Sequence, residues 1–292
     1  MRIRRGRSAL FVAVVLAGAF VAAGRPFAES FLQLVEHGTG NVVGAAIKAG
    51  AKVSQRDGQG RTPLMHAVAC DQGLDVISVL LRAGARVDDR NNDGATPLMY
   101  AAGKNRHAEV ISALLEAGAA VNDQSYEGVT PLMYAAGDNP NAEVVSVLLT
   151  AGARVQERDF SGATALMHAA EGNRNPGIIS ALLLAGADAN VRDNFGQTAL
   201  MMAAWNNTNP DVIKTLLHGG ADVNQGSSEG MTALMYAAAF SHNPEVIPIL
   251  LRAGANRHMR SSEGKTAFNY AEQNADVKGS AQCRALEPAP YF

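Results

Sequence analysis

The residue types that could do chemistry in this chain are a Gly-Lys-Thr triplet, seven histidines, two cysteines and a recurring methionine. The triplet at residues 264–266 matches the end of a phosphate-binding loop. Such a loop needs a further glycine five residues before Gly264, and Met259 occupies that position. We therefore expect no phosphate site there.

No other group has the spacing of a catalytic or metal centre. No serine or cysteine has the sequence context of an activated nucleophile, and the carboxylate pair Asp88-Asp89 stands in a turn sequence that favours aspartate for backbone reasons. His66 and His168 hold equivalent places three copies apart in a repeated sequence, which predicts a separation of about 25–30 Å. Zinc ligands converge within about 2.1 Å of the ion. The sequence thus predicts no enzyme, no metal, no cofactor and no small-molecule substrate.

The repeated sequence has a period of 34 residues. "GATPLMYAA" at residues 94–102 returns almost unchanged at residues 128–136 and 230–238. The threonines of a Gly-x-Thr motif keep the period throughout: Thr62, Thr96, Thr130, Thr164, Thr198, Thr232 and Thr266. Self-similarity at a fixed period is typical of a repeat protein, in which each unit shares its apolar face with the next.

Each copy predicts two short helices and a turn. The Gly-x-Thr threonine is a preferred N-cap, and the proline after it suits the first helical position. A polar loop follows, in which Asn209 or Asn243 caps a second helix that begins at Pro210 or Pro244. A glycine ends this helix in the left-handed conformation, and an Asn/Asp/Gly-rich segment supplies a hairpin-like turn.

These motifs resemble the ankyrin repeat, namely Gly-x-Thr-Pro-Leu-x-x-Ala-Ala followed by Leu-Leu-x-x-Gly-Ala-x-Val-Asn. The resemblance covers about residues 29–285 and implies an all-α solenoid of stacked helix-turn-helix units with hairpin-like turns. The period differs from the family's common 33 residues, and the extra residue falls in the loop between the helices.

Methionine also replaces the family's usual histidine after Thr-Pro-Leu, which puts the hydrogen bonds of that histidine in doubt. The methionines are Met65, Met99, Met133, Met167, Met201 and Met235. We interpret this methionine series as apolar packing, since methionine fills irregular gaps. Copper binding or a redox function through the series is the alternative.

The sequence divides into an export segment, two caps and six full repeats. We place a signal peptide at residues 1–23, an N-terminal capping repeat at 24–54, and a C-terminal capping repeat with a tail at 259–292. The full repeats are 55–88, 89–122, 123–156, 157–190, 191–224 and 225–258. Caps are predicted because residues 31–53 lack the Gly-x-Thr-Pro-Leu motif, and because the last copy becomes polar at Glu272 and Gln273.

The first residues have the composition of an export signal. Four arginines without an acid precede seventeen uncharged residues, as in the n- and h-regions of a signal peptide. Small side chains favour cleavage after Ala23; cleavage after Ala28, or retention as an inner-membrane anchor, are the alternatives. We expect a periplasmic or secreted bacterial protein. The net charge of −2 is not that of a nucleic-acid-binding protein.

Two cysteines in an exported protein raise the question of a disulfide. Cys70 lies in the first full repeat and Cys283 in the last copy, which predicts a separation of about 50–60 Å in an intact solenoid. Bridged Cα atoms must lie within about 7 Å. We expect no bond, with Cys70 packed as a small hydrophobic residue and Cys283 a free thiol.

Aromatic residues gather where a partner would bind, although only 5% of the chain is aromatic. Members of the resembled family bind through a concave face made of turn tips and exposed ends of first helices. The candidates at the turn tips are Tyr126, Phe160 and Phe195; those at first-helix ends are Trp205 and Phe240; those in the groove are Tyr100, Tyr134, His168 and Tyr236. We expect these rings to anchor another protein. The alternative is that each ring folds onto its neighbour and caps the stack.

The predicted function is therefore a non-enzymatic, monomeric protein-binding module of the bacterial envelope. Proteins of this appearance include partners of stress-defence enzymes such as catalase, and immunity proteins that occlude an effector. The sequence leaves both roles open, together with a membrane-tethered scaffold.

Overall fold

The structure is a computed structural model that describes residues 27–243 and 245–287. These residues form helices joined by turns and loops, with no strand among them and one isolated antiparallel bridge between Gly226 and Thr232. The all-α prediction is confirmed. The predicted signal peptide lies outside the described residues.

The helices come in pairs, each with a first and a second helix. The first helices are α2 (Phe27–His37), α4 (Pro63–Ala69), α6 (Pro97–Lys104), α8 (Pro131–Asp138), α10 (Ala165–Gly172), α12 (Ala199–Asn206), α14 (Ala233–Phe240) and α16 (Ala267–Ala271). The second helices are α3 (Gly40–Lys48), α5 (Leu74–Arg82), α7 (Ala108–Glu116), α9 (Ala142–Thr150), α11 (Pro176–Leu184), α13 (Pro210–His218), α15 (Val246–Arg252) and α17 (Ala281–Ala285).

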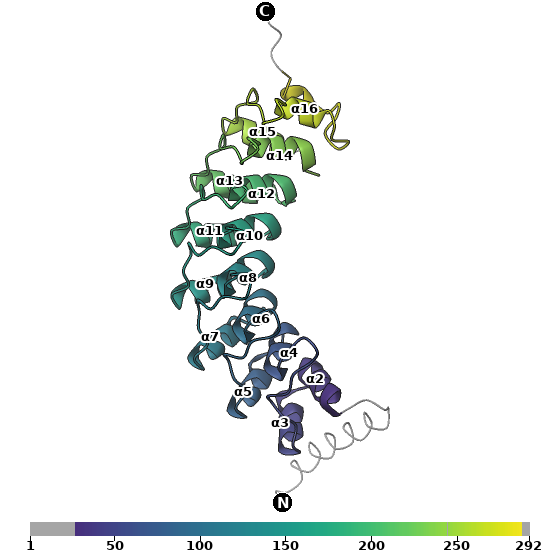
Figure 1. The fold of residues 1–292 in the computed structure, drawn as a ribbon, viewed down its shortest axis with the longest axis vertical. Helices are drawn as coiled ribbons and strands as arrows, with labels where there is room; N and C mark the ends of the chain where they lie inside the picture. Colours follow the sequence, from purple (N-terminus) through teal and green to yellow (C-terminus); the bar gives the residue numbers. More distant parts are fainter. Residues whose placement is uncertain (1–26, 244, 288–292) are drawn as a thin grey trace, which may run out of the picture. The chain divides into compact units, whose positions relative to one another are not determined.

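The contacts divide the chain into two compact units. Unit 1 comprises the residues up to 135 and residues 146–153; unit 2 comprises residues 136–145 and those from 154 onward. Within unit 1, α2, α4 and α6 pack in succession, as do α3, α5 and α7 (Figure 1). Within unit 2 the same holds for the series α10, α12, α14 and α16, and for α11, α13 and α15. Each helix pair thus covers the apolar face of the pair before it.

The core of each layer consists of aliphatic and small side chains. Leu98 of α6 and Ile111 and Leu114 of α7 are fully buried, and full burial of such a side chain contributes about 1.5–3 kcal/mol. Ala101 and Ala102 are also fully buried, and their small size lets a neighbouring helix approach closely. Little aromatic bulk is needed because many small contacts add up along the stack.

The methionine series forms part of the helix caps as well as the core. The six side chains are at most 2% exposed. Thr96 Oγ1 accepts the N–H of Met99 at 3.4 Å, and Met99 Sδ accepts the N–H of Thr96 at 3.4 Å. The same reciprocal pair joins Thr62 with Met65 and Thr130 with Met133. Sulfur is a weak acceptor, but here it supplies the return bond of a capping box.

Of the two second helices whose first residue was predicted, α13 starts at the predicted residue and α15 starts later. Asn209 caps α13, which begins at Pro210, and accepts the N–H of Asp211 at 3.0 Å. The predicted start of the other helix at Pro244 is wrong, because α15 begins at Val246; Pro244 itself lies outside the described residues. Pro248 explains the delay, since it has no N–H to donate to the carbonyl four residues earlier.

Buried asparagines join successive layers through the loop between the two helices. Asn207 is 4% exposed, and its Nδ2 donates to the carbonyls of Ala170 (2.9 Å) and Asn173 (2.8 Å) in the preceding layer. Its Oδ1 accepts the N–H of Asn209 at 3.0 Å. These carbonyls lie at the end of a first helix, where no intrahelical donor reaches them. We call this set the asparagine ladder; it also includes Asn105, Asn173 and Asn274.

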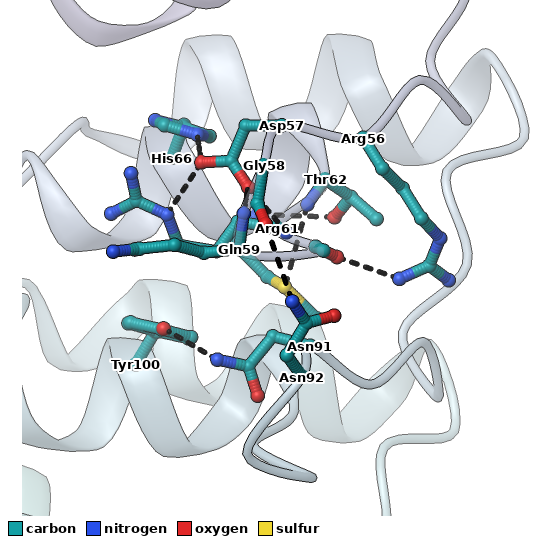
Figure 2. A network of polar contacts seen from close by, with 12 residues as sticks. Arg56, Asp57, Gly58, Gln59, Arg61, Thr62, His66, Asn91, Asn92 and Tyr100 are labelled. Carbon is teal, nitrogen blue, oxygen red and sulfur yellow. Dashed lines mark hydrogen bonds and ion pairs between the residues drawn. The ribbon is translucent and has the colours of Figure 1, made fainter.

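Arginines connect the turns that precede the first helices. Arg56 Nη1 donates to the carbonyl of Gly60 in its own turn and to that of Arg90 in the next, both at 2.7 Å. Arg90 does the same for Gly94 and Gln124. Figure 2 shows the first of these turns with Asp57, which accepts the N–H groups of Gln59 and Arg61. Each turn is therefore fixed both internally and to its successor.

The asparagine ladder predicts a large local effect on stability. We expect Asn207→Ala to lower the free energy of unfolding by about 2–3 kcal/mol, because two buried carbonyls and one N–H lose their partner. Urea unfolding followed by circular dichroism measures this change. Asn206→Ala, at the exposed neighbouring position, should cost less than about 0.5 kcal/mol. Equal losses in the two variants would contradict the role of the ladder.

Candidate functional site

Three aromatic side chains at the turn tips are largely exposed to water. The exposed fraction is 64% for Tyr126, 73% for Phe160 and 66% for Phe195. Tyr126 belongs to unit 1 and the two phenylalanines to unit 2. Burial of a ring of this size is favourable by about 1.5–3 kcal/mol, so each ring is a candidate to be covered by a partner.

Backbone hydrogen bonds hold these tips in register with their neighbours. The N–H of Tyr126 donates to the carbonyl of Asp93 at 2.9 Å, and that of Ser228 donates to the carbonyl of Phe195 at 3.0 Å. Asn194 adds a side-chain bond from Nδ2 to the carbonyl of Phe160 at 2.9 Å. The exposed rings therefore stand on fixed backbone rather than on loose loops.

Tyr126 lies against the glycine of the preceding turn. Gly94 has φ +78°, and a Cβ there would come within 2.6 Å of Tyr126 Cδ1. Glycine is thus needed for both the left-handed backbone and the ring above it. One face of the Tyr126 ring thus packs on Gly94. Most of the ring surface is exposed, so the other face is available to a partner.

A second aromatic group lies at the ends of α12 and α14 in unit 2. The ring centroids of Trp205 lie 5.9 Å from Tyr236 and 5.5 Å from Phe240, and Tyr236 and Phe240 are 6.3 Å apart. Trp205 is 42% exposed and Phe240 45%, but Tyr236 is only 6% exposed. Gln197 Nε2 donates to Tyr236 Oη at 2.8 Å. Tyr236 therefore supports the other two rings from beneath and offers little surface of its own.

The remaining candidates are half-buried in polar networks. Tyr100 Oη accepts from Asn91 Nδ2 at 3.0 Å, as Figure 2 shows. Burial raises the pKa of Tyr100 and of Tyr134, so both phenols are neutral. His168 Nε2 lies 2.9 Å from Asp159 Oδ2. The pKa of Asp159 is raised by burial but lowered more by hydrogen bonds from Ser161, His168 and Ala163, so the net shift is downward.

The comparison with known proteins agrees with this architecture. A family model described as ankyrin repeats in three copies matches six overlapping stretches, residues 31–125, 69–159, 104–193, 132–227, 166–261 and 200–282. The chain belongs to the ankyrin-repeat family. The crystal structure of the human ASB11 ankyrin repeat domain is similar, at 30% sequence identity and a TM-score of 0.69 over 79% of this chain and all of that one. A search of curated proteins found no match.

Ankyrin repeats are protein–protein interaction modules, and their fold typically serves as a non-enzymatic scaffold. Repeat proteins of this kind recognise partners over extended surfaces. In this ankyrin-repeat protein, the exposed rings lie on the turn tips and at the ends of first helices, which gives a candidate binding surface on each unit.

Two exposed apolar residues, Leu74 and Leu184, were not predicted from the sequence. Leu184, the last residue of α11, is 89% exposed. The equivalent positions hold Arg82, Glu116, Thr150 and His218, all polar. A position-by-position comparison of the repeats would have identified this leucine, because it is the apolar member of a polar series.

The packing predicted for Cys70 is wrong, whereas Cys283 is a free thiol as predicted. Both are free, but Cys70 is exposed at the end of α4, whereas Cys283 is 4% exposed in α17. Burial and the nearby Glu36 raise the pKa of Cys70, and Arg61 lowers it by less, so the group is a thiol near neutral pH. The prediction failed because Cys70 follows the last apolar turn of α4, which periodicity alone does not show.

Neither a metal-binding cluster nor a membrane-spanning helix is found among the described residues. Among residues 27–243 and 245–287, no three His, Cys, Asp or Glu side chains are placed to hold a metal ion. In the same residues, no helix has the length and apolar character to cross a membrane. The six side chains of the methionine series are buried, and the sulfurs of Met65, Met99 and Met133 accept hydrogen bonds at the helix caps.

Trp205 is the single tryptophan of the chain. Tryptophan fluorescence therefore reports on the cluster of Trp205, Tyr236 and Phe240. We expect Phe240→Ala to shift its fluorescence emission to the red and to cost about 1 kcal/mol of stability, because an aromatic neighbour is lost. Phe195→Ala, which removes an exposed ring of the same type from a turn tip, should leave the emission unchanged. An unchanged spectrum in Phe240→Ala would show that the three rings do not form the described cluster.

Proposed function

We propose that this ankyrin-repeat protein binds another protein through the aromatic rings of its turn tips and first-helix ends. One observation carries the proposal: Tyr126, Phe160, Phe195, Trp205 and Phe240 are 42–73% exposed in a chain that is only 5% aromatic. Exposed aromatic rings are typical anchors of protein–protein interfaces.

The way the rings are held favours a macromolecular partner. Each ring is rigid and amphipathic or apolar, and it loses little conformational entropy when a partner covers it. The tips are fixed by backbone hydrogen bonds, and the Trp205 ring is already packed against Tyr236 and Phe240. Such preorganisation lowers the cost of association. Rings on separate repeats match an extended protein surface better than a single small ligand.

We further propose that the protein is non-enzymatic, because its chemically versatile side chains already have structural partners. The sulfurs of Met65, Met99 and Met133 lie at helix caps. His66 and His168 are engaged by carboxylates. A metal or redox role through the methionine series would require these sulfurs to leave the core. Metal analysis of the purified protein tests this point, with less than one equivalent of bound metal expected.

Export to the bacterial envelope is also part of the proposal, supported by the arginine-rich and apolar composition of residues 1–24. In that compartment the module acts as a monomer, as an accessory to a stress-defence enzyme or as an immunity protein. The N-terminal residue of the mature protein, read by Edman degradation, distinguishes cleavage after Ala23 from retention as an anchor.

Substitution of the exposed rings tests the binding function. We expect Tyr126→Ala, Phe160→Ala and Trp205→Ala together to abolish capture of a partner from envelope extract, while helical circular dichroism is unchanged. Central aromatic anchors contribute about 2 kcal/mol or more each, or roughly thirtyfold in affinity. The partner is identified by mass spectrometry with the unmodified chain, and its affinity for each variant is then measured by calorimetry.

Leu184→Ala is the matched control, because Leu184 is the most exposed large apolar residue described but lies at the end of a second helix. We expect this variant to bind as the unmodified chain does. Undiminished binding by the triple variant, or an equal loss with Leu184→Ala, would refute a site at the tips and first-helix ends.

A further inference from the structure

Two aspartates in the turns before first helices each meet a histidine nine residues further along the chain. In the first full repeat, Asp57 Oδ2 lies 3.0 Å from His66 Nε2, as Figure 2 shows. In the repeat 157–190, Asp159 Oδ2 lies 2.9 Å from His168 Nε2. An ionised carboxylate only accepts hydrogen bonds, and an imidazole N–H is a donor. Each of these aspartates thus has a donor from its own repeat.

Where the same turn position holds a neutral side chain, the residue nine positions later is a tyrosine. Asn91 Nδ2 donates to Tyr100 Oη at 3.0 Å, and Ser261 Oγ lies 3.0 Å from Tyr270 Oη. The same sequence pattern joins Ser125 with Tyr134 and Ser227 with Tyr236. The two positions are therefore matched, with histidine opposite aspartate and tyrosine opposite asparagine or serine.

The repeat 191–224 lacks this match. Asp193 holds the turn position, but Met202 holds the helix position, and a thioether has no proton to donate. Asp193 Oδ1 accepts the N–H groups of Phe195 at 2.9 Å and of Gln197 at 2.7 Å. Asp193 is only 8% exposed, yet no hydrogen bond to its Oδ2 is found among residues 27–243 and 245–287.

The nearby cationic positions do not supply the missing donor. Arg61 Nε donates to Asp57 Oδ2 at 2.8 Å in the first full repeat. The equivalent residue here is Gln197, whose Nε2 donates to a tyrosine of the next repeat at 2.8 Å. Arg192 is adjacent to Asp193, but its Nε donates to the carbonyl of the turn glycine at 3.1 Å. Asp193 therefore lacks both of the side-chain donors that Asp57 has.

The unpaired oxygen can be reached from outside. Gln225 Oε1 is the one fully buried side-chain N or O atom without a partner in the described part of the chain, so Asp193 Oδ2 keeps some contact with water. Its surroundings belong to the candidate binding surface of unit 2. Phe195, two residues after Asp193, is 66% exposed, and Trp205, one helical turn after Met202, is 42% exposed.

We propose that Asp193 is a recognition carboxylate that binds a lysine or arginine side chain of the partner protein. This inference rests on the proposed function, because Phe195 and Trp205 are among the rings assigned to the partner. A basic side chain supplies the donor that Oδ2 lacks, and a hydrogen bond between charged groups is about twice as strong as a neutral one. Its alkyl stem covers apolar surface such as that of Met202.

A titration with N-acetyl-arginine amide tests the site without knowledge of the partner. The amide signals of Phe195 and Gln197 in the NMR spectrum of the full chain report on it, since both N–H groups bond to Asp193. We expect saturable shifts with a Kd of about 1–10 mM, as a single charged contact allows. N-acetyl-citrulline amide, a neutral analogue of similar shape, should bind about tenfold more weakly or worse.

Asp193→Asn removes the charge and keeps the turn. Asn91 holds the equivalent position in its own repeat, where its Oδ1 accepts the N–H groups of Asp93 and Ala95. We expect this variant to bind the arginine derivative about tenfold more weakly or worse. Met202→His should weaken binding to a similar extent, because the imidazole gives Oδ2 a donor from within the repeat, as His168 does for its aspartate.

Asp159→Asn is the matched control, since its Oδ2 is already bonded to His168. We expect this variant to bind the arginine derivative at the Phe195 and Gln197 signals as the unmodified chain does. An equal response to the citrulline derivative, full binding by Asp193→Asn, or no saturation below about 100 mM would rule out a basic contact at Asp193.

The captured partner separates this inference from the proposed function. We expect Asp193→Asn to lower its affinity about tenfold or more, and Asp159→Asn to leave it unchanged. If the triple ring variant loses the partner while Asp193→Asn keeps full affinity, the ring surface stands and the basic contact is refuted. If the triple ring variant keeps the partner, the ring surface fails, and the arginine titration still decides for or against the site at Asp193.

Discussion

The constraint on which much of this structure depends is that first helices such as α4, α8 and α10 end in carbonyl groups that their own repeat does not satisfy. The asparagine ladder supplies the missing donors from the following layer, as Asn207 does for Ala170 and Asn173. Burial of polar groups without partners would cost several times what a hydrogen bond contributes. Each of these layers is therefore completed by its successor.

The candidate binding surface follows from the same constraint. Because layers are fixed by the ladder on one side and by arginines and backbone bonds at the turns, the tips need no packing of their own to stay in place. Exposed rings such as Phe160 can therefore stand on a rigid support without weakening the core. In a globular domain of similar size we would expect those rings to be buried in the core, since few other large side chains compete for burial.

The sequence predicts those features that depend on neighbours within a repeat. The Thr96 cap, the start of α13 at Pro210 and the left-handed glycines all follow from local backbone preferences. It fails where the environment comes from another layer or from later in the chain. Tyr236 is buried because Trp205 and Phe240 cover it, and Cys283 is buried in the last helix pair. The later start of α15 could have been predicted from Pro248, because a proline at that position removes an N–H donor from the first turn of the helix.

The two classes of polar contact in unit 1 have different consequences for how the stack can respond to its surroundings. Asparagine amides and arginines do not change charge between pH 5 and 8, so the contacts they make between layers are constant. The junction of α2 with α4 also contains His66, whose imidazole lies between the carboxylates of Glu36 and Asp57. In a repeat protein, stability is close to a sum of nearest-neighbour terms. A change in the contacts of the N-terminal pair is therefore expected to act mainly on the pair next to it.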